Sequence, residues 1–267
     1  MRNRVEGRSW DRALVTGASA GIGRAIAVRL ADAGTDLVLV SRNRDRLEAL
    51  AGELRAGGTG PDVEVLAADL SDPDDLAEVE RRVTASEAPI DLLVNNAGLG
   101  YEGPFHTQSS SEVSETIGVN LVALVRLTHA ALGPMTARGR GQVILVSSMA
   151  SLQGMPMTAV YAATKAFITS LGEALHEEMK PNGVVVTTVL PGLTRTEFHQ
   201  RGGWDLNRWP SVGWQDADAV ATEALAAAVR GRAEVVTGRL NRVYSVVTTK
   251  APRRLRRIAI GWAARRR

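Results

Sequence analysis

A glycine-rich turn between a short apolar strand and a helix constrains this 267-residue chain most strongly. Residues 13–15 are apolar, and Gly17, Gly21 and Gly23 follow them, before a helix whose apolar residues recur on one face. Glycine lets the backbone turn tightly and lets the amide groups of the following helix approach a pyrophosphate. The turn therefore predicts the first strand–turn–helix unit of a dinucleotide-binding sheet.

Strands and helices alternate along the rest of the chain. This order predicts an α/β fold with a doubly wound parallel sheet of Rossmann type, in three α/β/α layers. We expect a single domain at 11–249, after a lead-in at 1–10. The predicted strands are 36–40, 63–67, 90–94, 142–147, 184–190 and 234–236, and the predicted helices are 44–55, one capped by Ser71, 111–138 and 157–180.

Composition narrows the kinds of site that the chain can carry. It has no cysteine, so disulfides and thiolate metal sites are excluded, which fits a reducing cytosol. No signal peptide is expected, and no run approaches the 18 or so apolar residues of a membrane span. No metal is expected either, because the histidines match no metal motif. His129 and His176 fall on predicted helices and His199 falls where it could reach a substrate, while His106 has no assigned role.

Ser148, Tyr161 and Lys165 form a chemically suggestive pattern. A spacing of four residues on a predicted helix places Tyr161 and Lys165 on one face. A nearby ammonium lowers the pKa of a phenol, which can then exchange a proton with a carbonyl or alcohol oxygen. Ser148 follows an apolar strand, at the edge where open parallel sheets bind ligands. Taken alone, the pattern also fits a surface Tyr–Lys pair and a serine in a turn.

The end of the second predicted strand indicates which dinucleotide is bound. Sites for NAD place an acidic residue there to bind the ribose hydroxyls, whereas Ser41 and Arg42 occupy these positions here. A guanidinium can bind a 2′-phosphate in a forked geometry. The pattern favours NADP(H), against the alternative that Arg42 is one of several solvated arginines.

Six motifs in register resemble the short-chain dehydrogenase/reductase family. The resemblance covers nearly the whole chain and implies an oxidoreductase that interconverts a carbonyl and a secondary alcohol with NADP(H). It also implies a homodimer or homotetramer paired through the two longest helices. The motifs are TGASAGIG at 16–23, NNAG at 95–98, Asn120, Ser148, Tyr161-x3-Lys165 and PGLTRT at 191–196.

The resemblance also implies a role for each matching residue. Tyr161 is the catalytic acid/base, and Lys165 lowers its pKa and holds the nicotinamide ribose. Ser148 orients the substrate oxygen, and Asn120 supports a water-mediated proton relay to the lysine. One departure concerns Ala20, because some NADP(H) members carry a basic residue there. The implied cofactor-binding residues are Gly17, Ser19, Gly21, Ile22, Gly23, Ser41, Arg42, Asp69, Leu70, Asn96, Ala97, Gly98, Tyr161, Lys165, Pro191, Gly192, Thr194 and Thr196.

A segment at about 193–216 interrupts the alternation and is expected to cover the site as a mobile lid. Its aromatic residues have two interpretations. They either line an apolar pocket for a lipid-like or ring-shaped carbonyl, or anchor the lid to the body or to another subunit. These aromatic residues are Phe198, Trp204, Trp209 and Trp214, and Tyr101, Glu102 and Phe105 are expected near the same mouth.

The tail at 250–267 is basic and amphipathic. It carries eight Lys or Arg and no acid, so residues 1–249 have a net charge of −5 in a chain of net charge +3. Such a helix can lie on an anionic membrane surface, end as a solvated terminus or clasp a second subunit. Nucleic-acid binding is not expected. The interleaved apolar residues are Leu255, Ile258, Ala259, Ile260 and Trp262.

Two classes of function follow. The first is a cytoplasmic NADP(H)-dependent oxidoreductase for a small-molecule carbonyl or alcohol, with a peripheral membrane contact as one option for the tail. The alternative is a non-catalytic NADP(H)-binding regulatory or membrane-surface protein, against which the four intact catalytic positions argue. A sugar epimerase or dehydratase is disfavoured by the spacing of Gly17 and Gly21.

Overall fold

The computed structural model describes residues 10–56, 60–205 and 213–265. A seven-stranded parallel sheet forms its centre, in the order β3-β2-β1-β4-β5-β6-β9. The predicted doubly wound α/β fold is confirmed. The strands are β1 (Arg12–Thr16), β2 (Asp36–Ser41), β3 (Val63–Ala67), β4 (Leu92–Asn95), β5 (Gly141–Val146), β6 (Val184–Leu190) and β9 (Glu234–Val236).

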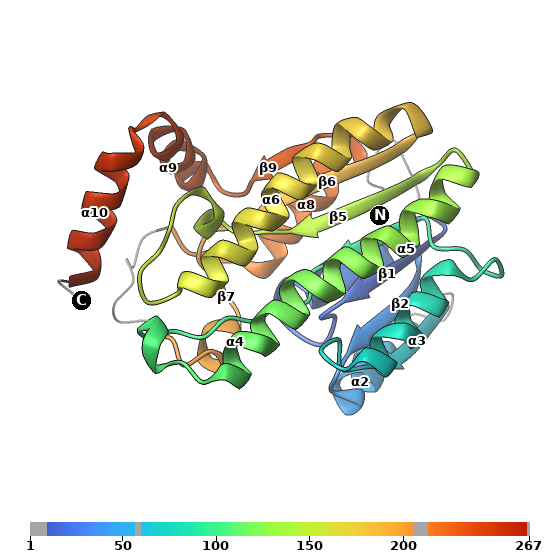
Figure 1. The fold of residues 1–267 in the computed structure, drawn as a ribbon. Helices are drawn as coiled ribbons and strands as arrows, with labels where there is room; N and C mark the ends of the chain where they lie inside the picture. The colour runs from blue at the N-terminus through green and yellow to red at the C-terminus, as the bar shows by residue number, and fades with distance from the viewer. Residues whose placement is uncertain (1–9, 57–59, 206–212, 266–267) are drawn as a thin grey trace.

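Helices cover both faces of the sheet (Figure 1). Alternate strand residues point to opposite faces, so Val15 and Leu39 join one apolar core while Leu14 and Val38 join the other. On the first face lie α1 (Gly21–Asp32), α2 (Arg44–Arg55) and α8 (Ala217–Val229). On the second lie α3 (Pro73–Thr84), α5 (Leu124–Ala137) and α6 (Ala159–Met179). The two cores fix the strand ends that carry the site.

Two predicted elements differ in detail. The predicted helix at 111–138 is α4 (Ser110–Ile117) and α5 joined by a π-helical turn (Gly118–Ala123). The N-cap of α3 is Asp72 instead of Ser71, since the Asp72 carboxylate accepts from the amides of Asp74 and Asp75 at 2.9 and 3.0 Å. Ser71 donates to Asp69 instead. Short 3₁₀ turns lie at Phe105–Thr107, Met149–Leu152 and Lys180–Asn182.

The helix from α4 to α5 is apolar enough by length and composition to cross a membrane. Its most apolar window has a mean hydropathy of 1.4, and 44% of that window is buried. Leu124 and Leu127 pack in the same core as Leu76 of α3 and Ile168 of α6. In this structure the helix is therefore part of the core of the domain.

Two further segments follow the last strands. The lid contains β7 (Thr194–Arg195), α7 (Phe198–Arg201) and β8 (Gln215–Asp216), and β7 pairs with β8. The chain ends in α9 (Arg239–Lys250) and α10 (Arg253–Arg265), which we call the C-terminal arm. Figure 1 shows α10 at the periphery of the molecule, beside the C-terminus.

Candidate active site

A cavity of about 1470 Å³ lies at the carboxyl ends of the strands. Its floor includes the turns after β1 and β4, the neighbouring strands at which the strand order reverses. Ligands bind at this position in open α/β sheets. The predicted site residues all line this cavity except Gly23 and Asn120, which lie behind its wall.

The glycine-rich turn leaves room where side chains would collide. Gly17 and Gly21 have φ of +66° and +55°, which favour glycine. A Cβ added to Gly23 would lie 2.4 Å from Nδ2 of Asn96. That amide donates to the Thr16 carbonyl at 2.9 Å and so ties the turn after β4 to the turn after β1. The open backbone fits the pyrophosphate of a dinucleotide.

Arg42 lies at the far end of the cavity among carboxylates. Its Nη1 is 2.9 Å from Oε1 of Glu115 and 3.7 Å from Oδ2 of Asp69. Burial alone would raise the pKa of Asp69, but hydrogen bonds from Ser71 and the Arg42 charge hold this pKa below its usual value. The Ser41 hydroxyl is buried without a hydrogen-bond partner among the described residues. A free hydroxyl beside a guanidinium fits a ribose phosphate.

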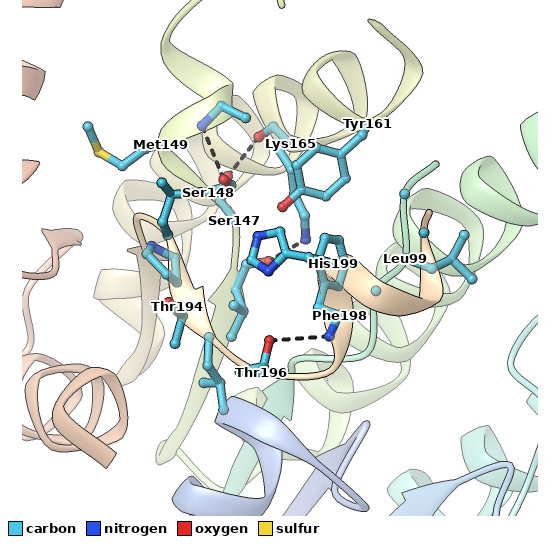
Figure 2. Close-up of a pocket in the computed structure, with 18 of the residues that line it drawn as sticks. Leu99, Ser147, Ser148, Met149, Tyr161, Lys165, Thr194, Thr196, Phe198 and His199 are labelled. Atoms are coloured by element: carbon cyan, nitrogen blue, oxygen red, sulfur yellow. Dashed lines mark hydrogen bonds between the residues drawn. The ribbon is translucent and has the colours of Figure 1, made fainter. Parts of the chain in front are cut away.

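Tyr161 from α6 and Ser148, which follows β5, both line the cavity (Figure 2). Tyr161 is 9% exposed, and this burial raises the pKa of its phenol to about 12, while Ser148 shifts the pKa in the opposite direction. The phenol is therefore protonated at neutral pH and can serve as a proton donor. Ser148 Oγ accepts from the Ala150 amide at 3.1 Å, which fixes the serine side chain.

Lys165 shares the face of α6 with Tyr161, as predicted, but it does not lower the pKa of the phenol in this structure. Its Nζ donates to the Val146 carbonyl at 2.8 Å and lies 5.7 Å from the centroid of the Tyr161 ring. Burial lowers the pKa of the lysine itself to about 8. Desolvation therefore shifts both pKa values toward the uncharged forms in this unliganded arrangement.

Asn120 sits in the π-helical turn and is fully buried. Its Oδ1 accepts from the Leu99 amide at 3.0 Å, and its Nδ2 donates to the Leu99 carbonyl at 2.8 Å and to Oγ1 of Thr164 at 3.0 Å. A Cβ added to Gly98 would lie 3.3 Å from Asn120 Oδ1 and 3.4 Å from Lys165 Nζ. The asparagine thus holds the segment after β4 beside the lysine.

The segment after β6 enters the cavity at Pro191 and continues into the lid. Thr194 is buried, and its hydroxyl donates to the Gly192 carbonyl at 3.0 Å. The hydroxyl of Thr196 accepts from the Phe198 amide at 3.3 Å, as Figure 2 shows. These bonds set the course of the chain between the cofactor cradle and the lid.

The lid packs directly on Tyr161. The centroid of the Tyr161 ring is 5.5 Å from that of Phe198 and 5.7 Å from that of Trp204. The Trp204 indole donates to the Gly100 carbonyl at 2.8 Å. Phe198 and Trp204 therefore line the cavity, and Trp204 also anchors the lid to the body of the domain. Trp209 lies outside the described residues.

His199 is the histidine that reaches the cavity. It is 6% exposed, and its ring contacts Phe198, Trp204 and Trp214 at centroid distances of 5.2–5.5 Å. Burial lowers its pKa, and its Nδ1 has no hydrogen-bond partner in the described part of the chain. By contrast, His106 and His129 are exposed, and His176 Nδ1 lies 2.8 Å from the Val186 carbonyl.

Sequence reasoning missed the contribution of the C-terminal arm. Three residues were expected near the cavity mouth, and Tyr101 does line the cavity. Glu102 instead accepts a hydrogen bond from the Asp205 amide at 2.8 Å, and Phe105 is 62% exposed. The amphipathic pattern of the tail was the available signal, but its apolar face was not connected with the pocket. Arm residues in the wall include Leu240, Tyr244, Val247, Leu255, Ala259 and Ile260, and Met155 and Arg46 are further unpredicted members.

Comparison with known proteins agrees with this geometry. The family model described as short chain dehydrogenase matches residues 11–205. A very-long-chain 3-oxoacyl-CoA reductase of Bos taurus is 32% identical over 201 residues, which are 72% of this chain and 63% of that protein. The chain thus spans less than two thirds of the length of the curated relatives that match first.

Two solved structures are similar over most of their length. A short-chain dehydrogenase from Sphingobium yanoikuyae in complex with NADPH has 34% identity and a TM-score of 0.81, over 90% of this chain and 96% of that one. The bulky-bulky ketone specific alcohol dehydrogenase from Comamonas testosteroni has 30% identity and a TM-score of 0.77, over 92% and 96%.

Proposed function

The chain belongs to the short-chain dehydrogenase/reductase family of oxidoreductases, and on that premise we propose that it interconverts a carbonyl and a secondary alcohol with NADP(H). The observation that carries this proposal is the buried, protonated Tyr161 beside Ser148 and Lys165, at the sheet edge that also holds the glycine cradle. When bound, the nicotinamide supplies or accepts the hydride.

The side chains divide the proton chemistry between them. Ser148 holds the substrate oxygen by a hydrogen bond, and the Tyr161 phenol donates its proton to that oxygen during reduction. Lys165, whose pKa is lowered to about 8, is placed to hold the ribose and to resupply the proton. Asn120 keeps the Leu99 segment beside the lysine, where a water-mediated relay would run.

Two arginines support a preference for NADP(H) over NAD(H). Arg42 and Arg46 both line the cavity, and no carboxylate stands at the end of β2. Arg42 is paired with Glu115 and Arg46 with Glu197, at 2.9 and 2.7 Å. A 2′-phosphate offers both guanidiniums a stronger, bidentate partner than these two solvent-accessible carboxylates.

A large apolar carbonyl compound is the proposed substrate. Phe198, Trp204 and Met155 pack together around Tyr161, and the C-terminal arm adds an apolar wall. Such a wall fits a long acyl chain or a ketone with two bulky substituents. The names of the compared proteins, a 3-oxoacyl-CoA reductase and a bulky-bulky ketone dehydrogenase, point the same way.

The first experiment is a titration of tryptophan fluorescence with NADPH and with NADH. We expect NADPH to bind at least about tenfold tighter, a difference of about 1.4 kcal/mol. Arg42→Ala should abolish that difference, whereas Arg44→Ala, a matched exposed arginine 4.0 Å from Glu48, should keep it. Equal affinities for the two cofactors would contradict the assignment of Arg42.

Tyr161→Phe separates an enzyme from a non-catalytic cofactor-binding protein. The variant should lose NADPH oxidation with ethyl 3-oxodecanoate as the probe ketone but keep NADPH affinity, because the phenol oxygen acts on the substrate. Wild-type protein that binds NADPH and reduces no ketone would favour the regulatory alternative. We also propose a cytoplasmic location, with which a chain free of cysteine is compatible.

A further inference from the structure

Exposed apolar surface is concentrated on the C-terminal arm. Among the described residues, most large apolar side chains that are exposed belong to α9 and α10. Their exposed fractions run from 49% to 64%, whereas monomeric proteins rarely expose a contiguous patch of this kind without a binding role. The side chains are Leu240, Val243, Tyr244, Val246, Val247, Leu255, Ile258 and Trp262.

The charge of the arm has a single sign. Residues 239–267 include no Asp or Glu, and the tail from 250 carries eight cations, while residues 1–249 have a net charge of −5. Arg253, Arg254 and Arg257 are exposed on α10. An identical arm from a second copy would bring the same cations, so arm-to-arm pairing is opposed by like charges. An anionic surface with an apolar interior complements both properties.

Helix α10 presents two different faces. Leu255, Ala259 and Ile260 line the cavity, whereas Ile258 and Trp262, four residues apart on one face, do not. The arm is held to the body through Arg256 Nη1, which donates to the Leu152 carbonyl at 2.8 Å, and through the Tyr244 hydroxyl, 2.9 Å from Gln153 Nε2. One helix is therefore both a wall of the cavity and an outward apolar surface.

We propose that the C-terminal arm docks on an anionic lipid bilayer, with the cavity mouth beside α10 facing the lipid, so that an apolar substrate enters from the membrane. The outward face of Ile258 and Trp262 would insert at the interface, and the arginines would contact lipid phosphates. Tryptophan and arginine are favoured at this depth. The docking rests on the arm alone, whereas the entry of substrate rests on the proposed function.

Docking is tested by co-sedimentation of the full chain with phosphatidylcholine vesicles, with or without phosphatidylglycerol. We expect binding to the anionic vesicles that weakens as salt is raised. Arg254→Glu combined with Arg257→Glu, and Ile258→Ser combined with Trp262→Ser, should each reduce binding about tenfold or more. Phe105→Ser, which removes an exposed aromatic outside the arm, should not reduce it.

The chain has no cysteine, so a single introduced cysteine can carry a label that reports how the arm is oriented on the bilayer, with no need for enzyme turnover. Leu255→Cys at the cavity rim, Ile258→Cys and, as the control, Phe105→Cys are each labelled with an environment-sensitive fluorophore. Anionic vesicles should shift the emission at 255 and 258 to the blue and leave 105 unchanged. A response at 258 but not at 255 would show docking with the mouth turned away and would overturn the entry route.

Entry from the membrane is tested with ketones of different solubility. Ile258→Ser with Trp262→Ser should slow NADPH-dependent reduction of vesicle-borne 6-tridecanone but leave reduction of a short water-soluble ketone unchanged. If wild-type protein reduces neither ketone while the vesicle and label results hold, the proposed function fails and the docking stands. The proposal would be overturned if the wild-type protein did not bind vesicles. It would also be overturned if light scattering showed that the Ile258→Ser, Trp262→Ser variant differs from wild type in oligomer mass.

Discussion

The Nζ atom of Lys165 lies 5.7 Å from the centroid of the Tyr161 ring and donates to the Val146 carbonyl instead of reaching the phenol oxygen. Both side chains are buried, and burial moves their pKa values in opposite directions, to about 8 for the lysine and about 12 for the tyrosine. At neutral pH only the lysine carries a cost in the unliganded fold, because the phenol is protonated in both the folded and the unfolded protein.

Lys165→Met should stabilise the unliganded protein at neutral pH while abolishing turnover. A lysine whose pKa falls from 10.5 to about 8 on folding lowers the free energy of unfolding by about 3 kcal/mol at pH 7. The variant removes this cost but also loses the hydrogen bond to the Val146 carbonyl, which offsets about 1 kcal/mol of the gain. The folded state disfavours the ammonium, so this cost is full below pH 8 and disappears as pH rises to 10.5. Thermal unfolding should show a gain that shrinks with rising pH, and a gain that does not change with pH would contradict the cause.

Gly100→Ala should displace Tyr161, the proposed proton donor, without disturbing the glycine-rich turn after β1. A Cβ at this position would lie 2.6 Å from Cδ2 of Tyr161, closer than real side chains approach. We expect kcat with a probe ketone to fall about tenfold or more, which is about 1.4 kcal/mol in the barrier, at unchanged NADPH affinity. The matched control is Gly154→Ala, where the added Cβ meets nothing within 4 Å. Equal activities of the two variants would refute the contact.

His199 should make the stability of the fold fall on the acid side of neutrality. Burial lowers its folded pKa below the unfolded value of about 6.5, so the folded state disfavours the imidazolium. The stability that depends on the neutral ring is present above that unfolded value and is lost as pH falls through it. His199→Phe keeps an aromatic ring without a titrating group. Melting temperatures at about pH 7.5 and 5.5 should differ less for this variant than for wild type.

The outer faces of α5 and α6 should join two subunits. Val122 in the π-helical turn, Val125 on α5 and Phe167 on α6 are 36–47% exposed, and burying them between two copies would remove this apolar surface from water. Light scattering at micromolar concentration should give a dimer or larger. Val122→Glu with Phe167→Glu should yield a folded monomer, while Phe105→Glu should not change the mass. A monomeric wild type would contradict this prediction.

Local patterns were sufficient to predict most of the fold and the positions of the cradle. The strand at 234–236 was predicted from the local sequence pattern. The shared helix face of Tyr161 and Lys165 was predicted from their spacing, which is also local. The π-helical turn was not predictable, because Asn120 within it bonds to Leu99, a partner 21 residues away in sequence. Long-range contacts of this kind leave no periodic trace.

The pKa of the phenol and the role of the arm escaped sequence reasoning for related reasons. Spacing shows that Lys165 and Tyr161 share a face, but the balance between their attraction and their burial depends on residues from other elements, such as Trp204 of the lid. Likewise, the amphipathic pattern of α10 shows an apolar face without showing that Leu255 and Ala259 would meet the cavity.

The hydrogen bond from the Trp204 indole to the Gly100 carbonyl ties the lid to the segment beside Tyr161. Gly100 leaves no room for a Cβ beside the Tyr161 ring, and Trp204 packs edge-on against the same ring. On the proposed function, opening of the lid to release product would loosen the packing that orients the Tyr161 phenol. A change at Trp204 that loosens the lid and hastens departure of the product would therefore also leave the next proton transfer less well aimed.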